Sequence, residues 1–367
     1  MEFQIGLATP ADDHAIRALC RREAMPGNIV VTYEREPDFS SGCRVTGSDF
    51  QVLVARDQPD GEVVGVACRS TRTLFINGQP QRFGYLGQLR IDQRFRGRWL
   101  VSRGFSQLKQ LHDRDPVPAY LVSIIAGNHE AEAILVRRPR RFFPSFHRVA
   151  DFCTLAISLG RTKSPLNGEV EISSAAPSQI SEHARFLQCN GRRRQFFPVW
   201  TEDSLRELTS LGLRIEDLRI ARRNGEIAGI AGLWDQSAFK QTVVQGYSRW
   251  VKAAAPVCNL GAPWIGRAAL PRPGTKLRSV YVAFICIAND EAQVFAALLR
   301  ELYNLATLRG FDYLLIGLDA RDPLLPIARK YAHVLYASRL YLAEWPDGGN
   351  FHEQLDSRPA YVDIATL

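Results

Sequence analysis

The chain has 367 residues, 46% of them hydrophobic and 23% charged, which is typical of a globular protein and long enough for two domains. Its apolar runs fall short of the roughly 20 residues that a membrane span needs, and its first residues lack a secretory signal pattern, so we expect a cytoplasmic protein with no membrane contact. The net charge of +8 is spread over both halves and the 7 cysteines form no C-x-x-C pair, which argues against nucleic acid as a partner and against a bound metal.

Strand and helix patterns alternate through the first half of the chain. The expected strands are short apolar runs or alternate in polarity, and the expected helices carry apolar residues three and four apart. The segment 30–42, VVTYEREPDFSSG, is predicted as a loop. In chain order we predict a strand at 3–10, a helix at 12–22, a hairpin at Phe50–Cys68, a strand at 83–92, a helix at 97–112, a strand at 119–127, a helix at 129–138 and a strand at 149–159.

The second half repeats this order. Its hairpin is the clearest match, because Glu62–Cys68 (EVVGVAC) and Glu226–Gly232 (EIAGIAG) agree in residue type at each position, with Gly65 over Gly229. The matching elements are a strand at 169–177, a helix at 178–188, the hairpin at Leu218–Trp234, a strand at 277–288, a helix at 290–310, a strand at 312–320, a helix at 323–332 and a strand at 334–345.

This duplication predicts two α/β domains of like fold, each with a mixed sheet flanked by helices. We place the first domain at 1–160, a linker rich in Gly, Pro and Ser at 161–177, and the second domain at 178–367, with a first strand that begins near residue 169.

The order of elements, together with the segment Gly87–Phe105, resembles the GCN5-related N-acetyltransferase (GNAT) superfamily. LRIDQRFRGRWLVSRGF is similar to that family's cofactor segment, with Leu89 and Ile91 on the strand and Arg96-Gly97 as its Arg-Gly pair. The resemblance implies tandem GNAT-like acyltransferase domains. It also implies an acyl-CoA co-substrate, such as acetyl-CoA, that lies along the strand with its phosphates on the next helix start.

The resemblance implies a set of residues that bind the co-substrate. Trp99 and Val101 depart from the family, which has glycine or another small residue in this loop, and Leu135 stands where the family often has a Tyr. Arg94, with the cluster Arg137–Arg141, offers further charges for the adenosine phosphate, and the alternative for that cluster is a solvated helix end. The implied binding residues are Leu89, Arg90, Ile91, Arg96, Gly97, Arg98, Trp99, Leu100, Val101, Ser102 and Asn128.

The acceptor amine must lose a proton, which calls for a base. The segment 30–42 falls where the family places its acceptor-side elements, so we predict that Tyr33, Glu34 and Glu36 supply the catalytic group. The alternative is that Glu34 and Glu36 belong to a solvated run of ion pairs. Gln88 stands where many family members have a catalytic Glu, but an amide cannot accept a proton.

The second half has no Arg-Gly pair after its fourth strand. Asn289, Asp290 and Glu291 open the next helix instead, and carboxylates there would repel a phosphate. We therefore interpret the second domain as a copy that does not bind the co-substrate and that shapes either the acceptor site or a homodimer.

The predicted function is acyl-CoA-dependent N-acyl transfer, in which a small-molecule or peptide amine attacks the thioester directly. Two alternatives stay open. One is a tandem GNAT-like transferase that takes amino acids from aminoacyl-tRNA, and the other is a non-catalytic binding protein with a decayed site.

Overall fold

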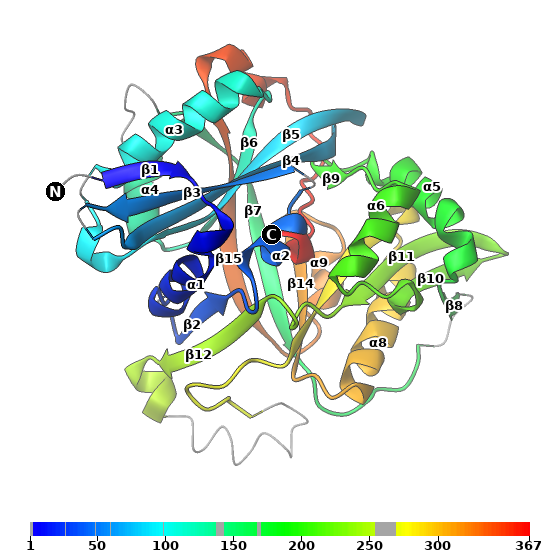
Figure 1. The fold of residues 1–367 in the computed structure, drawn as a ribbon. Helices are drawn as coiled ribbons and strands as arrows, with labels where there is room; N and C mark the ends of the chain where they lie inside the picture. The colour runs from blue at the N-terminus through cyan, green and yellow to red at the C-terminus, as the bar shows by residue number, and fades with distance from the viewer. Residues whose placement is uncertain are drawn as a thin grey trace.

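A computed structural model describes residues 3–25, 27–47, 49–58, 60–97, 99–136, 143–166, 170–253 and 269–367. A single mixed sheet of 13 strands runs through both halves of this part of the chain, with helices on its faces (Figure 1). Within the described residues, no helix combines the length and apolar character needed to cross a membrane.

The strands repeat in both halves, as the sequence predicts. The first half contributes β1 (Phe3–Leu7), β3 (Asp49–Asp57), β4 (Val63–Ile76), β5 (Gln79–Ile91), β6 (Tyr120–Ile125) and β7 (Ser145–Ser158). The second half contributes β8 (Glu171–Ser174), β10 (Leu218–Arg223), β11 (Glu226–Trp234), β13 (Ser279–Ile287), β14 (Tyr313–Asp319) and β15 (His333–Glu344), and the short β9 (Phe197–Pro198) pairs with β4.

The last strand of each half is exchanged with the other half. β15 lies between β6 and β7, and β7 in turn pairs with β14, so the strand order is β1-β3-β4-β5-β6-β15-β7-β14-β13-β11-β10-β8. β5 pairs with β6, and β13 with β14, in parallel, whereas the other pairs are antiparallel. The fold class is therefore mixed α/β with two halves of one topology, joined by backbone hydrogen bonds in the middle of the sheet.

The segment 30–42 is not a loop, which corrects the sequence prediction. It contains β2 (Ile29–Glu34) and α2 (Phe39–Arg44), and β2 pairs with β12 (Gln241–Tyr247) from the second half to form a separate two-stranded sheet. One strand of this small sheet therefore comes from each half.

The helices cover both faces of the central sheet. α1 (Asp13–Arg22) and α2 pack on one face of the first half, against Val54 and Val66. α3 packs on the other face, where it meets Leu53 and Ala55. The remaining bounds are α3 (Leu100–Arg114), α4 (His129–Leu135), α5 (Ile180–Gly191), α6 (Glu202–Glu207), α8 (Ala292–Leu308) and α9 (Leu325–Ala328).

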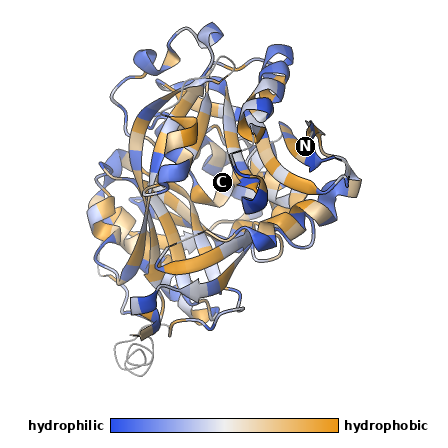
Figure 2. Cartoon of the chain, turned by 90° about the vertical axis from the view of Figure 1, so that its left-hand side faces the viewer, coloured by the Kyte–Doolittle hydropathy of each residue, from blue (hydrophilic) through white to orange (hydrophobic). Residues whose placement is uncertain are grey.

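Hydrophobic residues follow the strands and the inner faces of the helices (Figure 2). In the second half they form one large buried cluster around Trp200, Trp234 and Phe284, whereas the first half has several smaller clusters. A buried cluster of this kind is closely packed, and the first half is where the structure leaves a cavity of substantial size.

Candidate functional site

The two central parallel strands of the first half separate after a short contact. β5 and β6 are paired only at Gly84 with Tyr120 and at Tyr85 with Leu121. Beyond this point the backbone of β5 has no partner strand on the β6 side within the described residues. An unpaired strand edge presents N–H and C=O groups that can hydrogen-bond an extended ligand.

A β-bulge lies at the place where the strands separate. Val66 pairs with Arg90 and Cys68 with Gly87, so β5 has one residue more than β4 over this stretch. Gln88 in the bulge has φ of 56°, a left-handed conformation that is uncommon for a residue other than glycine. The bulge turns Gly87 and Arg90 to the same face of the sheet as Cys68 and Val66.

A cavity of about 420 Å³ opens at this separation, within the range typical of ligand sites. It extends to both faces of the sheet, since Leu53 and Ala55 line it on the α3 face and Val54 and Val66 line it on the α1 face. Its wall is mostly apolar, which would favour an apolar chain over a free polar group.

The start of α3 faces this cavity. Leu100, Val101 and Gly104 line it, and a Cβ atom added to Gly104 would meet nothing within 4 Å. The N-cap residue, Trp99, has φ of 62°, and its side chain makes no capping hydrogen bond. The first N–H groups of this helix are therefore available to an anion, and the helix dipole favours negative charge there.

The bulky Trp99 does not obstruct the site. Its side chain is 71% exposed and is not part of the cavity wall. The left-handed backbone at Trp99 and at Gly97 (φ of 78°) shows why a glycine or small residue suits this turn.

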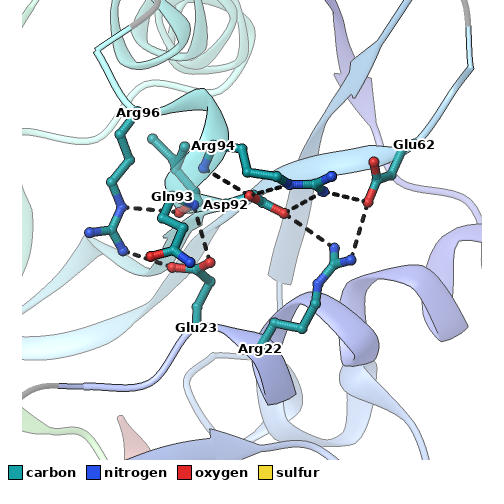
Figure 3. A network of polar contacts seen from close by, with 8 residues as sticks. Arg22, Glu23, Glu62, Asp92, Gln93, Arg94 and Arg96 are labelled. Carbon is teal, nitrogen blue, oxygen red and sulfur yellow. Dashed lines mark hydrogen bonds and ion pairs between the residues drawn. The ribbon is translucent and has the colours of Figure 1, made fainter.

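Two of the loop arginines are ion-paired within the protein (Figure 3). Arg94 pairs with Asp92 and Glu62, both at 2.8 Å, and Arg96 pairs with Glu23 at 2.7 Å. The side chains of Arg94 and Arg96 are 55% and 43% exposed, whereas those of Asp92 and Glu23 are buried. The Arg96 pair holds the loop against the end of α1, because Glu23 is the C-cap residue of that helix.

The structure brings together part of the predicted co-substrate set. Arg98 and Arg137–Arg141 lie outside the described residues. Asn128 also accepts a hydrogen bond from Ala131 N at 3.1 Å and so caps α4. Gly97 and Ser102 lie near the helix start but do not line the cavity. The predicted residues that line the cavity are Leu89, Arg90, Ile91, Leu100, Val101 and Asn128.

The predicted catalytic residues separate into two groups. Tyr33 lines the cavity, and burial raises the pKa of its hydroxyl. Glu34 points to the other face of β2, where it accepts a hydrogen bond from Thr32 Oγ1 at 3.0 Å. Glu36 is ion-paired with Arg17 and Arg21. Neither carboxylate is part of the described cavity wall, so the geometry gives no support to either as the base.

Sequence reasoning missed the part of the wall that comes from the second half. Lys240, at the start of β12, lines the cavity, as does Tyr281 from β13. Burial, and after it the charge of Arg35, holds the pKa of the Lys240 amine well below its usual range. Lys240 Nζ donates to Ala365 O at 3.2 Å and lies 5.5 Å from the Tyr281 ring centroid. No local pattern marks such a lysine, because its burial depends on packing between the two halves.

No protein-family model matches this sequence, and no curated protein is a significant match to it. Solved structures do match. A GCN5-related N-acetyltransferase from Sphaerobacter thermophilus has a TM-score of 0.57 at 14% identity, over 100% of this chain and 98% of that chain. The N-myristoyltransferase of Saccharomyces cerevisiae, solved with bound myristoyl-CoA, has a TM-score of 0.62 at 9% identity, over 93% of this chain and 78% of that one.

A third match is the glucosamine N-acetyltransferase region of a fungal multi-domain GH3 β-N-acetylglucosaminidase. Its TM-score is 0.61 at 15% identity, over 93% of this chain and 38% of that chain. The chain has the GNAT fold. The resemblance inferred from Gly87–Phe105 is thereby confirmed at the level of fold.

The second GNAT-like half has the same bulge in its corresponding strand. Phe284 lies in the bulge of β13 with φ of 59°, at the position of Gln88, since Gly229 pairs with Ile287 as Gly65 pairs with Ile91. Phe284 is fully buried.

The C-terminal segment fills the cleft of the second half. Phe284 N donates to Asp363 Oδ2 at 2.8 Å, and Ile285 N donates to Tyr361 Oη at 3.1 Å. A cavity lined by Ile285, Cys286 and Ile287 of this strand measures only about 10 Å³. The strand groups that are open in the first half are therefore occupied in the second by the protein's own side chains.

Replacing Tyr361 by phenylalanine is expected to lower the free energy of unfolding by about 1–3 kcal/mol, because Ile285 N–H is left buried without an acceptor. Urea unfolding followed by circular dichroism measures this. Tyr331→Phe is the matched control, since its hydroxyl accepts from Arg300 Nε at a half-buried place and the loss there should be smaller. Equal losses for the two variants would contradict the role given to Tyr361.

One group of side chains has the composition of a metal site. In the part of the chain that the structure describes, His147 of β7, Glu344 of β15 and His352 of the 3-10 turn Phe351–Gln354 place their ligand atoms within 4.8 Å of one another. Glu344 Oε1 lies 3.2 Å from His147 Nε2 and also contacts His352 Nδ1, and the centroids of the two imidazole rings are 3.4 Å apart. None of the three lines the cavity.

Proposed function

We propose that this protein is an acyl-CoA-dependent N-acyltransferase with its active site in the cavity of the first half. One observation carries the proposal. The bulged strand β5 separates from β6 and opens a cavity that the uncapped start of α3 also faces. One site thereby combines three features: an unpaired strand edge for an amide-containing arm, a helix N-terminus for phosphates and an apolar cavity.

The residues present fit an acyl-CoA molecule. The N–H and C=O groups of Gly87–Ile91 can pair with the amide-rich arm as an added strand would. The N–H groups of Leu100, Val101 and Ser102 can hold the pyrophosphate. Acyl-CoA would supply a thioester carbonyl that is activated toward amines.

The chain's own groups can serve the transfer step. A backbone N–H at the bulge near Gln88 can stabilise negative charge on the carbonyl oxygen. Lys240, whose pKa is lowered by burial, can accept a proton from the amine while its own N–H still donates to Ala365 O. The new N–C bond forms as the carbonyl π electrons move to its oxygen, and the C–S bond breaks when the C=O bond re-forms, so coenzyme A leaves as the thiolate.

The experiment is a thermal shift with acetyl-CoA, succinyl-CoA and palmitoyl-CoA, each against free coenzyme A. A ligand at about 100 times its Kd should add about 2.7 kcal/mol to the free energy of unfolding. An active enzyme should then release the coenzyme A thiol when a panel of amines is added.

Three results would count against the proposal. The absence of stabilisation by every acyl-CoA would exclude the co-substrate. Stabilisation without thiol release from any amine would favour a binding protein with a decayed site. Binding of tRNA in a filter assay, weakened steeply by salt, would favour the aminoacyl-tRNA alternative.

A further inference from the structure

Among the residues that the structure describes, the buried cationic side chains have carboxylate partners, except for those that line the cavity. Arg69 pairs with Asp115, and Arg194 pairs with Asp290 and Asp322. Arg35 and Lys240 have no carboxylate within 4 Å in the described residues, although they are only 5% and 8% exposed. Both line the cavity. The buried cationic residues of the described chain are Arg35, Arg69, Arg194, Arg219 and Lys240.

An arginine in this position differs from a lysine. A buried lysine can release its proton, whereas a guanidinium stays charged. Arg35 Nη1 donates to the backbone oxygen of Glu34 at 3.0 Å, which uses only one of its five N–H groups. A buried charge without a counter-charge costs several kcal/mol, so its presence calls for an anion that arrives with a ligand.

Arg90 adds a second guanidinium to the same wall. Its Nη1 donates only to Leu89 O, at 2.9 Å, and no carboxylate lies within 4 Å of it in the described residues. Arg35 and Arg90 line the same cavity, and burial lowers the pKa of Arg90.

The two arginines lie on the face of the sheet away from α3. Arg90 pairs with Val66, and directly paired residues share a face, which here is the face covered by α1. Arg35 comes from the end of β2, which also packs against α1. The start of α3, where the pyrophosphate would bind, lies on the opposite face. The arginine pair therefore serves the acceptor side and not the coenzyme phosphates.

We propose that the acceptor is an amine that also carries a carboxylate, as a free amino acid does, and that Arg35 and Arg90 bind this carboxylate. The inference rests on the proposed acyl transfer and names its acceptor class. Guanidinium and carboxylate form two parallel charge-assisted hydrogen bonds, which fix the orientation of the acceptor as well as its charge. The amine nitrogen then faces the thioester, and Lys240 on the adjoining wall takes its proton.

The test compares acids with their amides as acceptors. Glycine, β-alanine, glutamate and phenylalanine are each assayed beside glycinamide, β-alaninamide, glutamate α-amide (isoglutamine) and phenylalaninamide, with acetyl-CoA as donor and release of coenzyme A thiol as readout. We expect at least one acid to exceed its amide in kcat/KM by about 10- to 100-fold, the loss typical of a charged hydrogen-bonding partner.

Variants connect this preference to the arginines. Arg35→Met should lose the preference for acids, while its Kd for acetyl-CoA in calorimetry stays unchanged. Arg90→Met should lose the same preference, and its readout is the ratio of kcat/KM between each acid and its amide, because Arg90 belongs to the strand that would bind the coenzyme arm. Arg206→Met removes a 55%-exposed cation of the second half and should keep both properties. If Arg35→Met does not fold, Arg90→Met alone tests whether the arginines cause the preference for acids.

The outcomes separate the two proposals. In one outcome the protein binds acetyl-CoA and yet shows no higher kcat/KM, and no larger thermal shift, with any acid than with the corresponding amide. That result overturns the carboxylate inference and leaves the transferase proposal standing. A strong preference for succinyl-CoA over acetyl-CoA with no preference among acceptors also overturns it, because the anion would then be the acyl group. A protein that binds no acyl-CoA fails the proposed function itself, and the inference with it.

Discussion

Replacing Lys240 by methionine is expected to lower kcat by about 10²- to 10⁴-fold, the usual loss when a general base is removed. Methionine keeps the length and apolar character of the side chain, so the cavity keeps its shape. Burial and Arg35 lower the pKa of the amine, and the neutral form is the one that accepts a proton. The wild-type rate should therefore rise with pH through this lowered pKa, and the rise should be absent in Lys240→Met.

The variant Lys240→Arg distinguishes two roles for Lys240, a general base and a fixed positive charge. Arginine keeps the charge but does not release its proton in the working pH range. If Lys240 is the base, both variants are slow; if it only supplies charge, Lys240→Arg recovers activity. The measurement is kcat against pH for the three proteins, with the Kd of acyl-CoA as the control that should not change. An unchanged kcat and pH profile in Lys240→Met would place the base elsewhere.

Local patterns predicted the elements of the central sheet well. Gly65 and Gly229, aligned from sequence, do occupy the same place in the two hairpins, opposite Ile91 and Ile287. The alignment from sequence is confirmed because a hairpin is specified by residues that are neighbours in the chain. The prediction of a loop at 30–42 was wrong. This segment follows its short apolar run with the charged and turn-forming residues Glu34–Pro37, which favoured a loop, whereas in the structure β2 pairs with β12, for example Glu34 with Gln241.

The candidate site likewise has one part that the sequence predicts and another part that it does not. Leu89–Ile91 and the start of α3 could be predicted, since they belong to one continuous segment with a recognisable order of residues. Arg35 and Lys240 could not, because a charged residue beside a strand end is ordinarily solvated. Only the packing of one half against the other buries them. The filling of the second cleft by Tyr361 and Asp363 was likewise invisible, since that segment follows the whole repeated pattern.

Replacing Gly104 by phenylalanine is expected to prevent acyl-CoA from binding, with a loss of at least about 100-fold in affinity, or about 2.7 kcal/mol. Gly104 lies in α3 and lines the cavity, and its missing side chain leaves open space. A benzyl group there would occupy the space beside Val101 that the ligand needs. Because the added Cβ meets no protein atom within 4 Å, the fold should tolerate the change.

Two further variants test whether the lost affinity is a matter of space. Gly104→Ala adds only a methyl group and removes a flexible residue from a helix, so it should raise the free energy of unfolding by about 0.5–1 kcal/mol and still bind acyl-CoA. Gln110→Phe places the same ring on an exposed position of the same helix and should bind normally. Calorimetric titration with palmitoyl-CoA and acetyl-CoA measures all three. Normal affinity in a folded Gly104→Phe would show that acyl-CoA does not use this cavity.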